Sequence, residues 1–242
     1  MIKNIVLVHG AFADGSSWSR VILLLQAKDY HVTAVQQPLT SLEEDVAITR
    51  HVIRRQDGPC ILVGHSYGGA IITEAGNEPN VAGLVYIAAY APDEGENLAD
   101  LKAKAPPSPG STKVQVDDQG YAWIDRAAFR TVFAEDVDAQ EAAVMAATQM
   151  PWKVPVSRIS DPAWRKLPSW YQISERDQMI NPTLQRVMAL RMGAITLSLD
   201  TSHASAVSSP RAVAELIMRA TNDPSVLAKT PDDSASNHAA QR

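Results

Sequence analysis

The feature of this chain that most restricts its fold is a series of short apolar runs separated by longer segments of helical period. In the first of these segments Trp18, Val21 and Leu25 share one helical face, and in the second Ser41 and Glu44 form a capping box ahead of an amphipathic stretch. Strands of a parallel sheet read as nearly continuous apolar runs because helices cover both faces of the sheet. The sequence therefore predicts an α/β fold whose mostly parallel sheet has about six strands, at residues 5–8, 31–35, 60–64, 81–89, 169–174 and 195–199.

The repeating pattern stops after Pro92 and resumes at Pro168, and the stretch between them is rich in proline, acidic and aromatic residues. Residues 113–124 of this stretch predict a small hairpin, and residues 138–150 predict an amphipathic helix. The end of the chain is polar and interrupted by prolines, which is typical of disorder. The expected parts are a core of residues 1–92 and 168–221, an inserted lid of residues 93–167 and a disordered tail of residues 222–242.

Composition excludes several classes of partner. The chain has 242 residues and a net charge of −5, and no run of basic residues exceeds Arg54-Arg55, so we expect no binding of nucleic acid. No segment approaches the roughly 18 apolar residues that span a bilayer, and residues 5–8 are too short for the apolar part of a signal peptide. We therefore expect no membrane partner and a cytoplasmic location. Cys60 is the single cysteine, which excludes an internal disulfide and favours a buried, inert thiol.

Residues 60–69 read CILVGHSYGG and contain the motif G-x-S-x-G. An apolar strand precedes the motif and a segment of helical character follows it, which is the setting of a nucleophile elbow. In such an elbow the serine takes a strained backbone conformation, and the glycines let neighbouring chains pass close to it. The pattern predicts that Ser66 is a nucleophile. The alternative is a glycine-rich turn whose serine only caps the following helix.

A serine hydroxyl with its ordinary pKa is a poor nucleophile and needs a base. In folds with this elbow the catalytic groups follow the chain order serine, acid, histidine, so the base must come after Ser66. His238 lies in the expected disordered tail, whereas His203 comes shortly after the last predicted strand, at the sheet edge where active-site loops gather. We therefore predict that His203 is the base.

The acid that orients this histidine should follow the strand before the histidine strand. Asp177 fits because it comes after residues 169–174 and before the helix that opens at Asn181-Pro182. Asp200 is the rival, but it ends the strand that leads directly to His203 and suits a turn or capping role. Glu175 lies only one residue past the strand. We predict that Asp177 is the orienting acid.

The reaction also needs two backbone donors for an oxyanion. The elbow supplies the amide of Tyr67. The second amide should come from the loop HGAFADG at residues 9–15, either from Ala11 or from Phe12. The alternative of a phosphate-binding glycine loop has little support, because the loop lacks both common phosphate-binding patterns.

These residues resemble the α/β-hydrolase superfamily over residues 4–220, and most of all its small branch of plant methylesterases, hydroxynitrile lyases and bacterial esterases. The resemblance rests on HGAFADGSSW, GHSYGG, Asp177 and His203. It implies that Ser66 is the nucleophile, that His203 and Asp177 complete the triad, and that the amides of Ala11 and Tyr67 form the oxyanion hole. It also implies the strand order 2-1-3-4-5-6 and a lid over the site.

The resemblance also narrows the chemistry. Haloalkane dehalogenases and epoxide hydrolases carry an aspartate at the elbow, where this chain has Ser66. The lyases of the branch carry a threonine after the first histidine and a lysine after the catalytic histidine, where this chain has Gly10 and Ala204. Neither pattern is therefore matched here.

We expect a serine hydrolase that cleaves a small carboxylic ester and needs no cofactor and no metal. Phe12, Trp123 and Trp152 are the expected substrate-binding residues, although aromatic side chains in a lid often serve only its own packing. The alternatives are a protein that senses a small ester with slow turnover and a lyase of the hydroxynitrile type. The expected partner is a small-molecule ester, and a homodimer is compatible with the sequence.

Overall fold

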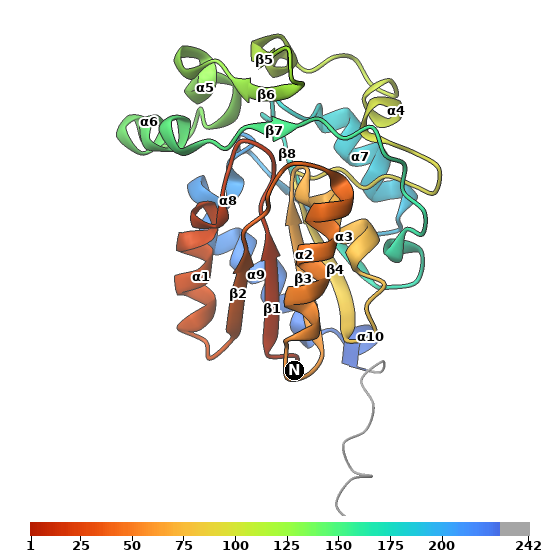
Figure 1. The fold of residues 1–242 in the computed structure, drawn as a ribbon. Coiled ribbons are helices and arrows are strands. Elements are labelled where there is room, and N and C mark those ends of the chain that lie inside the picture. Colours follow the sequence, from red (N-terminus) through yellow and green to blue (C-terminus); the bar gives the residue numbers. More distant parts are fainter. Residues whose placement is uncertain (228–242) are drawn as a thin grey trace, which may run out of the picture.

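The computed structural model describes residues 1–227, and its centre is a six-stranded parallel sheet (Figure 1). The order of the strands is β2-β1-β3-β4-β8-β9, which in chain order is the predicted 2-1-3-4-5-6. Each strand begins within a residue of its predicted start. The strands are β1 (Asn4–Val8), β2 (His31–Val35), β3 (Cys60–His65), β4 (Val81–Ile87), β8 (Ser169–Ser174) and β9 (Ile195–Leu199).

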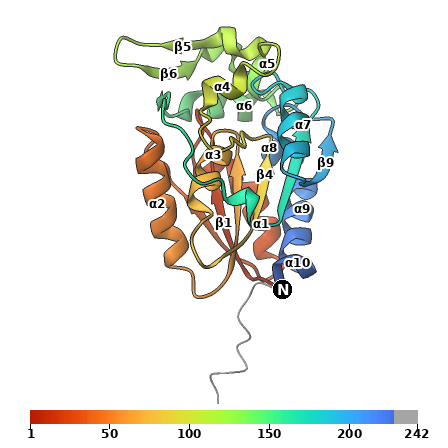
Figure 2. The same ribbon diagram turned by 90° about the vertical axis from the view of Figure 1, so that its right-hand side faces the viewer.

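Helices cover both faces of the sheet (Figure 2). On β1 the side chains alternate between the faces, with Ile5 in one buried hydrophobic cluster and Val6 in the other. The first cluster includes α1 (Ser19–Gln26) and α9 (Pro210–Asn222), and the second includes α2 (Leu42–Arg54), α3 (Gly68–Ala75) and α7 (Pro182–Arg191). The prediction of helices on both faces is therefore confirmed. Ser41 caps α2 as predicted, since its side chain accepts a hydrogen bond from the amide of Glu44 (3.2 Å).

Residues 98–153 of the expected lid lie over the carboxyl ends of the strands, at the opposite end of the sheet from the N-terminus, whereas residues 163–165 pack beside α3 (Figures 1 and 2). The predicted hairpin is present, and a third short strand extends it into an antiparallel sheet. The predicted helix over residues 138–150 is present, whereas two further helices, over residues 98–102 and 126–133, were not predicted. The elements of this region are α4 (Leu98–Lys102), η2 (Pro109–Lys113), β5 (Val114–Val116), β6 (Tyr121–Ile124), α5 (Arg126–Phe133), α6 (Ala139–Thr148), β7 (Trp152–Lys153) and η3 (Ala163–Arg165).

The expected disorder after residue 221 is wrong for the first part of the tail. Helix α9 continues to Asn222, and a short helix α10 (Pro224–Leu227) follows it because Val226 is buried in the cluster that contains α9. The rest of the expected tail, residues 228–242, lies outside the described residues. Cys60 is buried as predicted, and desolvation raises the pKa of its thiol to about 12. Among residues 1–227 no helix has the length and apolar character needed to cross a membrane.

Candidate active site

Ser66 stands in the sharp turn between β3 and α3. Its φ of 55° lies in the left-handed region, which non-glycine residues occupy only where the surrounding structure holds them there. The Ser66 amide donates a hydrogen bond to the carbonyl of Ile87 (3.2 Å), and the Ser66 carbonyl accepts from the amides of Gly69 and Tyr90 (both 3.0 Å). The backbone of β4 and of the segment after it therefore fixes the strained conformation that the elbow motif predicts.

The glycines of the elbow are required by close backbone contacts. A Cβ atom on Gly68 would lie 2.5 Å from the carbonyl oxygen of Val8, and one on Gly69 would lie 2.2 Å from the carbonyl oxygen of Tyr90. Both distances are far shorter than any real carbon contact, and backbone atoms cannot move aside as a flexible side chain can. Gly68 of the motif and Gly69, which follows it, are therefore required by the close approach of β1 and of the segment after β4.

His203 lies in the turn after β9 and contacts Ser66 directly. The Nε2 atom of His203 is 2.8 Å from the Oγ atom of Ser66, and its Nδ1 atom is 2.7 Å from the Oδ2 atom of Asp177. Both members of the His203–Asp177 pair are almost completely buried. The lid also holds the imidazole, because the ring of Phe133 packs edge-on against it with 4.8 Å between centroids. The structure thus places the three predicted triad residues in one continuous hydrogen-bonded chain.

Asp177 is held by its own loop. Its Oδ1 atom accepts hydrogen bonds from the amides of Met179 (2.7 Å) and Ile180 (2.9 Å), and its Oδ2 atom accepts from the Nε2 atom of Gln185 (2.8 Å) as well as from His203. These donors stabilise an ionised carboxylate in a buried position. Gln185 was not predicted, because its contact with Asp177 depends on how α7 packs.

The two rival acids lie elsewhere. The Asp200 side chain is 83% exposed and pairs with Arg176, with 3.0 Å between Oδ1 and Nε. Glu175 pairs with Arg186 at the surface. Among the described residues neither carboxylate forms a hydrogen bond with His203, so the geometry agrees with the choice of Asp177.

His65 forms a hydrogen bond with the backbone of His203. Its Nε2 atom is 2.9 Å from the carbonyl oxygen of His203 and must carry a proton, because a carbonyl can only accept. Burial, together with the proximity of His203, lowers the pKa of His65 well below its ordinary value, so the ring stays neutral. No role for His65 was predicted from the sequence. Its contact joins residues 138 positions apart, so no local spacing could have revealed it.

His9 organises the loop that follows β1. Its Nε2 atom accepts a hydrogen bond from the amide of Gln37 (2.9 Å), so its Nδ1 atom carries the proton and donates to the carbonyl of Gly10 (2.9 Å). Burial lowers the pKa of His9, which keeps it neutral. The loop then turns through Phe12, whose φ is 61°. The fold of the predicted oxyanion loop therefore depends on a histidine for which no role was predicted.

The backbone amides that are predicted to form the oxyanion hole donate no hydrogen bond to another described residue. In the part of the chain that the structure describes, no hydrogen-bond acceptor is found for the amides of Ala11, Phe12 or Tyr67. Ala11, Phe12 and Tyr67 line the same cavity as Ser66. Each of these amides is therefore available as a donor to a bound molecule.

A buried carboxyl group holds the side chain of Tyr67. Asp45 on α2 is completely buried, and it accepts hydrogen bonds from the hydroxyl of Tyr67 (2.8 Å) and from the amide of Leu39 (2.9 Å). Desolvation raises the pKa of this carboxyl to about 6. Asp45 was not predicted, because on sequence alone it is one more acidic residue in the first turn of a helix.

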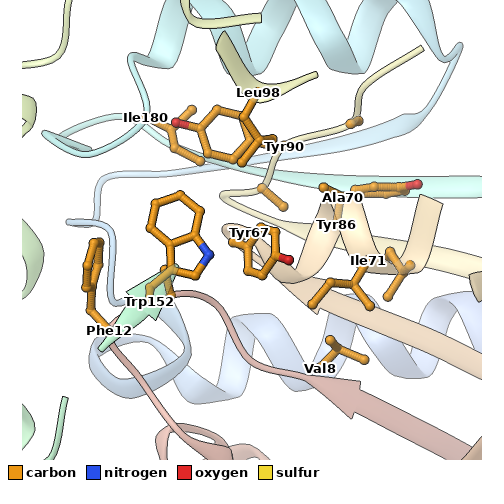
Figure 3. Close-up of a cluster of buried hydrophobic side chains, with 14 of the residues drawn as sticks. Val8, Phe12, Tyr67, Ala70, Ile71, Tyr86, Tyr90, Leu98, Trp152 and Ile180 are labelled. Carbon is orange, nitrogen blue, oxygen red and sulfur yellow. The ribbon is translucent and has the colours of Figure 1, made fainter. Parts of the chain in front are cut away.

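The cavity in front of Ser66 has a volume of about 380 Å³. The core and the lid both contribute to its wall. Trp152 lies between Phe12 and Tyr67, with ring centroids 5.7 and 5.2 Å away (Figure 3). Other residues of the wall include Tyr90, Ile180, Lys102, Pro106, Val114 and Val154.

Of the three expected substrate-binding residues, Phe12 and Trp152 lie in this wall, whereas Trp123 does not. Its indole Nε1 donates to the Oε1 atom of Gln115 on the neighbouring strand (3.2 Å), so Trp123 contributes to the packing of the lid hairpin. The structure therefore places Trp123 in the packing of the lid and not in the wall of this cavity. Within residues 1–227 no group of three or more His, Cys, Asp or Glu side chains is placed to hold a metal ion.

Comparisons with known proteins identify related hydrolases. A carbendazim hydrolyzing esterase of Nocardioides sp. (strain SG-4G) is 34% identical over 120 residues, which cover 44% of this chain and half of that protein (50%). A pyrethroid hydrolase of Sphingobium wenxiniae is 26% identical over 89% of this chain and 86% of its own. The crystal structure of a pyrethroid hydrolase from Sphingobium faniae JZ-2 superimposes with a TM-score of 0.83 at 25% identity, over 93% of this chain and 99% of that one. The model of the alpha/beta hydrolase family matches residues 5–216, and the chain therefore belongs to the alpha/beta hydrolase family.

Proposed function

We propose that this protein is a carboxylesterase that hydrolyses a small ester through an acyl-enzyme on Ser66. The observation that carries the proposal is the continuous hydrogen-bonded chain from Asp177 through His203 to Ser66, which ends in a cavity large enough for a small organic molecule. The named esterase and hydrolase relatives support the same reaction class.

In the proposed mechanism the Nδ1–H group of His203 donates to Asp177, which leaves the lone pair of Nε2 facing the hydroxyl of Ser66. His203 takes the hydroxyl proton as Ser66 attacks the ester carbonyl, and Asp177 stabilises the imidazolium without taking the proton itself. The amides of Tyr67 and of Ala11 or Phe12 stabilise the oxyanion. His203 then protonates the leaving alcohol and activates the water that releases the acid.

The cavity wall supports an ester with an apolar part beside the carbonyl. Phe12, Trp152 and Val114 are apolar side chains in the wall of the cavity that contains Ser66. A lyase reaction is less well supported. Ala204, which follows His203, carries no charge, although the lid brings Lys102 into the same cavity, a cation that the sequence around His203 did not suggest.

Kinetics on a panel of p-nitrophenyl esters test this proposal. We expect a burst of p-nitrophenol followed by steady turnover in the wild type, and a loss of about 10⁴-fold or more in the Ser66→Ala variant. A burst without further turnover would indicate a sensing protein instead. Release of cyanide from mandelonitrile that depends on Ser66 and exceeds ester turnover would indicate a lyase.

A further inference from the structure

Lys102 is the last residue of helix α4 in the lid, and its side chain forms part of the wall of the cavity that contains Ser66 and His203. Its ammonium group lies over the rings of Tyr90 and Trp152, 5.9 Å from each centroid. Both rings, which are labelled in Figure 3, belong to the wall of this cavity. The lid therefore places a cation between two aromatic walls of the candidate active site.

The charge of Lys102 is not balanced by a carboxylate of the protein. Within the described residues Lys102 forms no ion pair, whereas the nearby cations of the lid are paired: Lys104 with Glu96, and Arg158 with Asp100. Lys102 is accessible to solvent, yet the surrounding protein removes enough water to lower the pKa of its ammonium group. A cation in this position gains free energy from an anion that enters the cavity.

Tyr90 supplies a second donor in the same wall. Its hydroxyl has no hydrogen-bond partner among the residues that the structure describes, and burial raises its pKa, so it stays protonated. By contrast, the other polar side chains of the wall are engaged: Ser108 donates to the carbonyl of Met179 (2.8 Å), and Asn181 donates to the carbonyl of Pro106 (3.1 Å).

We propose that this cavity selects esters that carry a second, ionised carboxylate, separated from the reacting carbonyl by an apolar spacer. Lys102 would bind the carboxylate as a point charge, and Tyr90 would donate a hydrogen bond to it. A single ammonium group and a neutral hydroxyl match one negative charge, whereas the double charge of a phosphate would stay half compensated in a largely apolar cavity. This inference rests on the proposed esterase function and adds the chemical class of its substrate.

Two esters of equal length test the inference, p-nitrophenyl hydrogen adipate and p-nitrophenyl hexanoate, because they differ only in the charged end. The quantity compared is the ratio of kcat/KM for the anionic ester to that for the neutral ester. We expect Lys102→Met to lower this ratio about tenfold, mainly through the KM of the anionic ester. Lys102→Arg should keep most of the preference, because it keeps the charge.

Lys153 provides the matched control. It lies on the lid next to Trp152, but its ammonium group is over the ring of Tyr121 and outside the cavity wall. Lys153→Met changes the net charge by the same amount and should leave the ratio unchanged. An unchanged ratio in Lys102→Met, or an equal fall in Lys153→Met, would overturn the inference.

A binding measurement separates this inference from the proposed function. Monoethyl adipate can be titrated calorimetrically into the Ser66→Ala variant, which requires no turnover. We expect binding that weakens about tenfold when Lys102→Met is added. If the wild type hydrolyses no ester, the proposed function fails while this result still supports an anion site. Absent binding, or binding that does not depend on Lys102, contradicts the anion site even if ester hydrolysis is found.

Discussion

The sheet and the lid contribute to the same cavity in different ways. On the sheet side, Ser66 and Asp177 stand just beyond the carboxyl ends of their strands, and hydrogen bonds from backbone amides hold both of them. On the lid side, Trp152 and Lys102 are placed by contacts between rings and between a cation and rings. The sheet side is therefore fixed by directional hydrogen bonds, and the lid side by the packing of side chains.

This difference separates two kinds of effect. A change on the sheet side should lower the rate for every ester, because it removes groups that act on the reacting carbonyl. A change on the lid side should alter which ester is preferred, because the lid contacts the rest of the substrate. The following variants test that division, beginning with the largest expected effect.

Replacing the buried acid should have the largest effect. We expect Asp177→Asn to lower kcat by about 10⁴-fold for every ester, because an asparagine no longer stabilises the correct orientation and charge of His203. Asp200→Asn is the matched control, since Asp200 forms an exposed ion pair with Arg176. Steady-state kinetics of both variants decide between them, and the reverse ranking would move the role of the acid to Asp200.

Adding a methyl group at the elbow should reduce stability for reasons unrelated to the lid. In Gly69→Ala the new Cβ atom would meet the carbonyl oxygen of Tyr90 at 2.2 Å, so we expect a loss of about 3 kcal/mol or more in the free energy of unfolding. Gly58→Ala is the control, because its Cβ atom would meet nothing closer than 3.7 Å. Urea unfolding measures both, and equal stability of the two variants would refute the close contact.

Two tryptophans of the lid test which part of the lid contacts the substrate. Trp152 lies in the cavity wall, whereas Trp123 packs against the hairpin and donates to Gln115. We expect Trp152→Leu to raise KM for aryl esters about tenfold through lost ring contacts, with a smaller change in kcat. Trp123→Leu should leave KM close to the wild-type value. A larger change in KM for Trp123→Leu would mean that the lid binds substrate through its hairpin.

Asp45 gives a smaller effect that depends on pH. Its folded-state pKa is about 6, above its ordinary value of 3.8, so the unfolded chain releases this proton first as the pH rises. The contribution of Asp45 to stability is therefore present at low pH and is lost between about pH 4 and pH 6. Asp45→Asn has no titrating carboxyl at this position. The free energy of unfolding of this variant, relative to that of the wild type, should therefore rise from pH 4.5 to pH 7.

Urea unfolding at these two pH values measures the difference. Asp57→Asn is the control for the loss of one carboxylate, since Asp57 is exposed at the surface. A difference between Asp45→Asn and wild type that stays constant with pH would show that this carboxyl does not titrate in the expected range.

The triad and the sheet were predictable because their signals are local. The apolar runs gave the strands, and Ser66, Asp177 and His203 each follow a strand that could be recognised by itself. The supporting contacts were not predictable. His65 and Asp45 act through partners 138 and 22 residues away, and only the packed fold brings these partners together.

The lid shows the same limit more strongly. Its hairpin and α6 have periodic sequences and were predicted, but nothing in that pattern distinguishes Trp152 from Trp123 or Lys102 from Lys104. Which of them faces the cavity depends on how the lid rests on the sheet. The residues proposed to select the substrate are therefore those that sequence alone identified least well.

Labelling with a fluorophosphonate, followed by mass spectrometry of the peptides, tests the central claim most directly. The reagent reacts with a serine that is activated by a base and stabilised by an oxyanion hole, whatever ester the lid prefers. We expect one adduct on the peptide that contains Ser66 in the wild type and in Trp152→Leu, and none in Ser66→Ala. An adduct on another serine, or labelling that persists in Ser66→Ala, would contradict the assignment of the chemistry to the Ser66–His203–Asp177 chain.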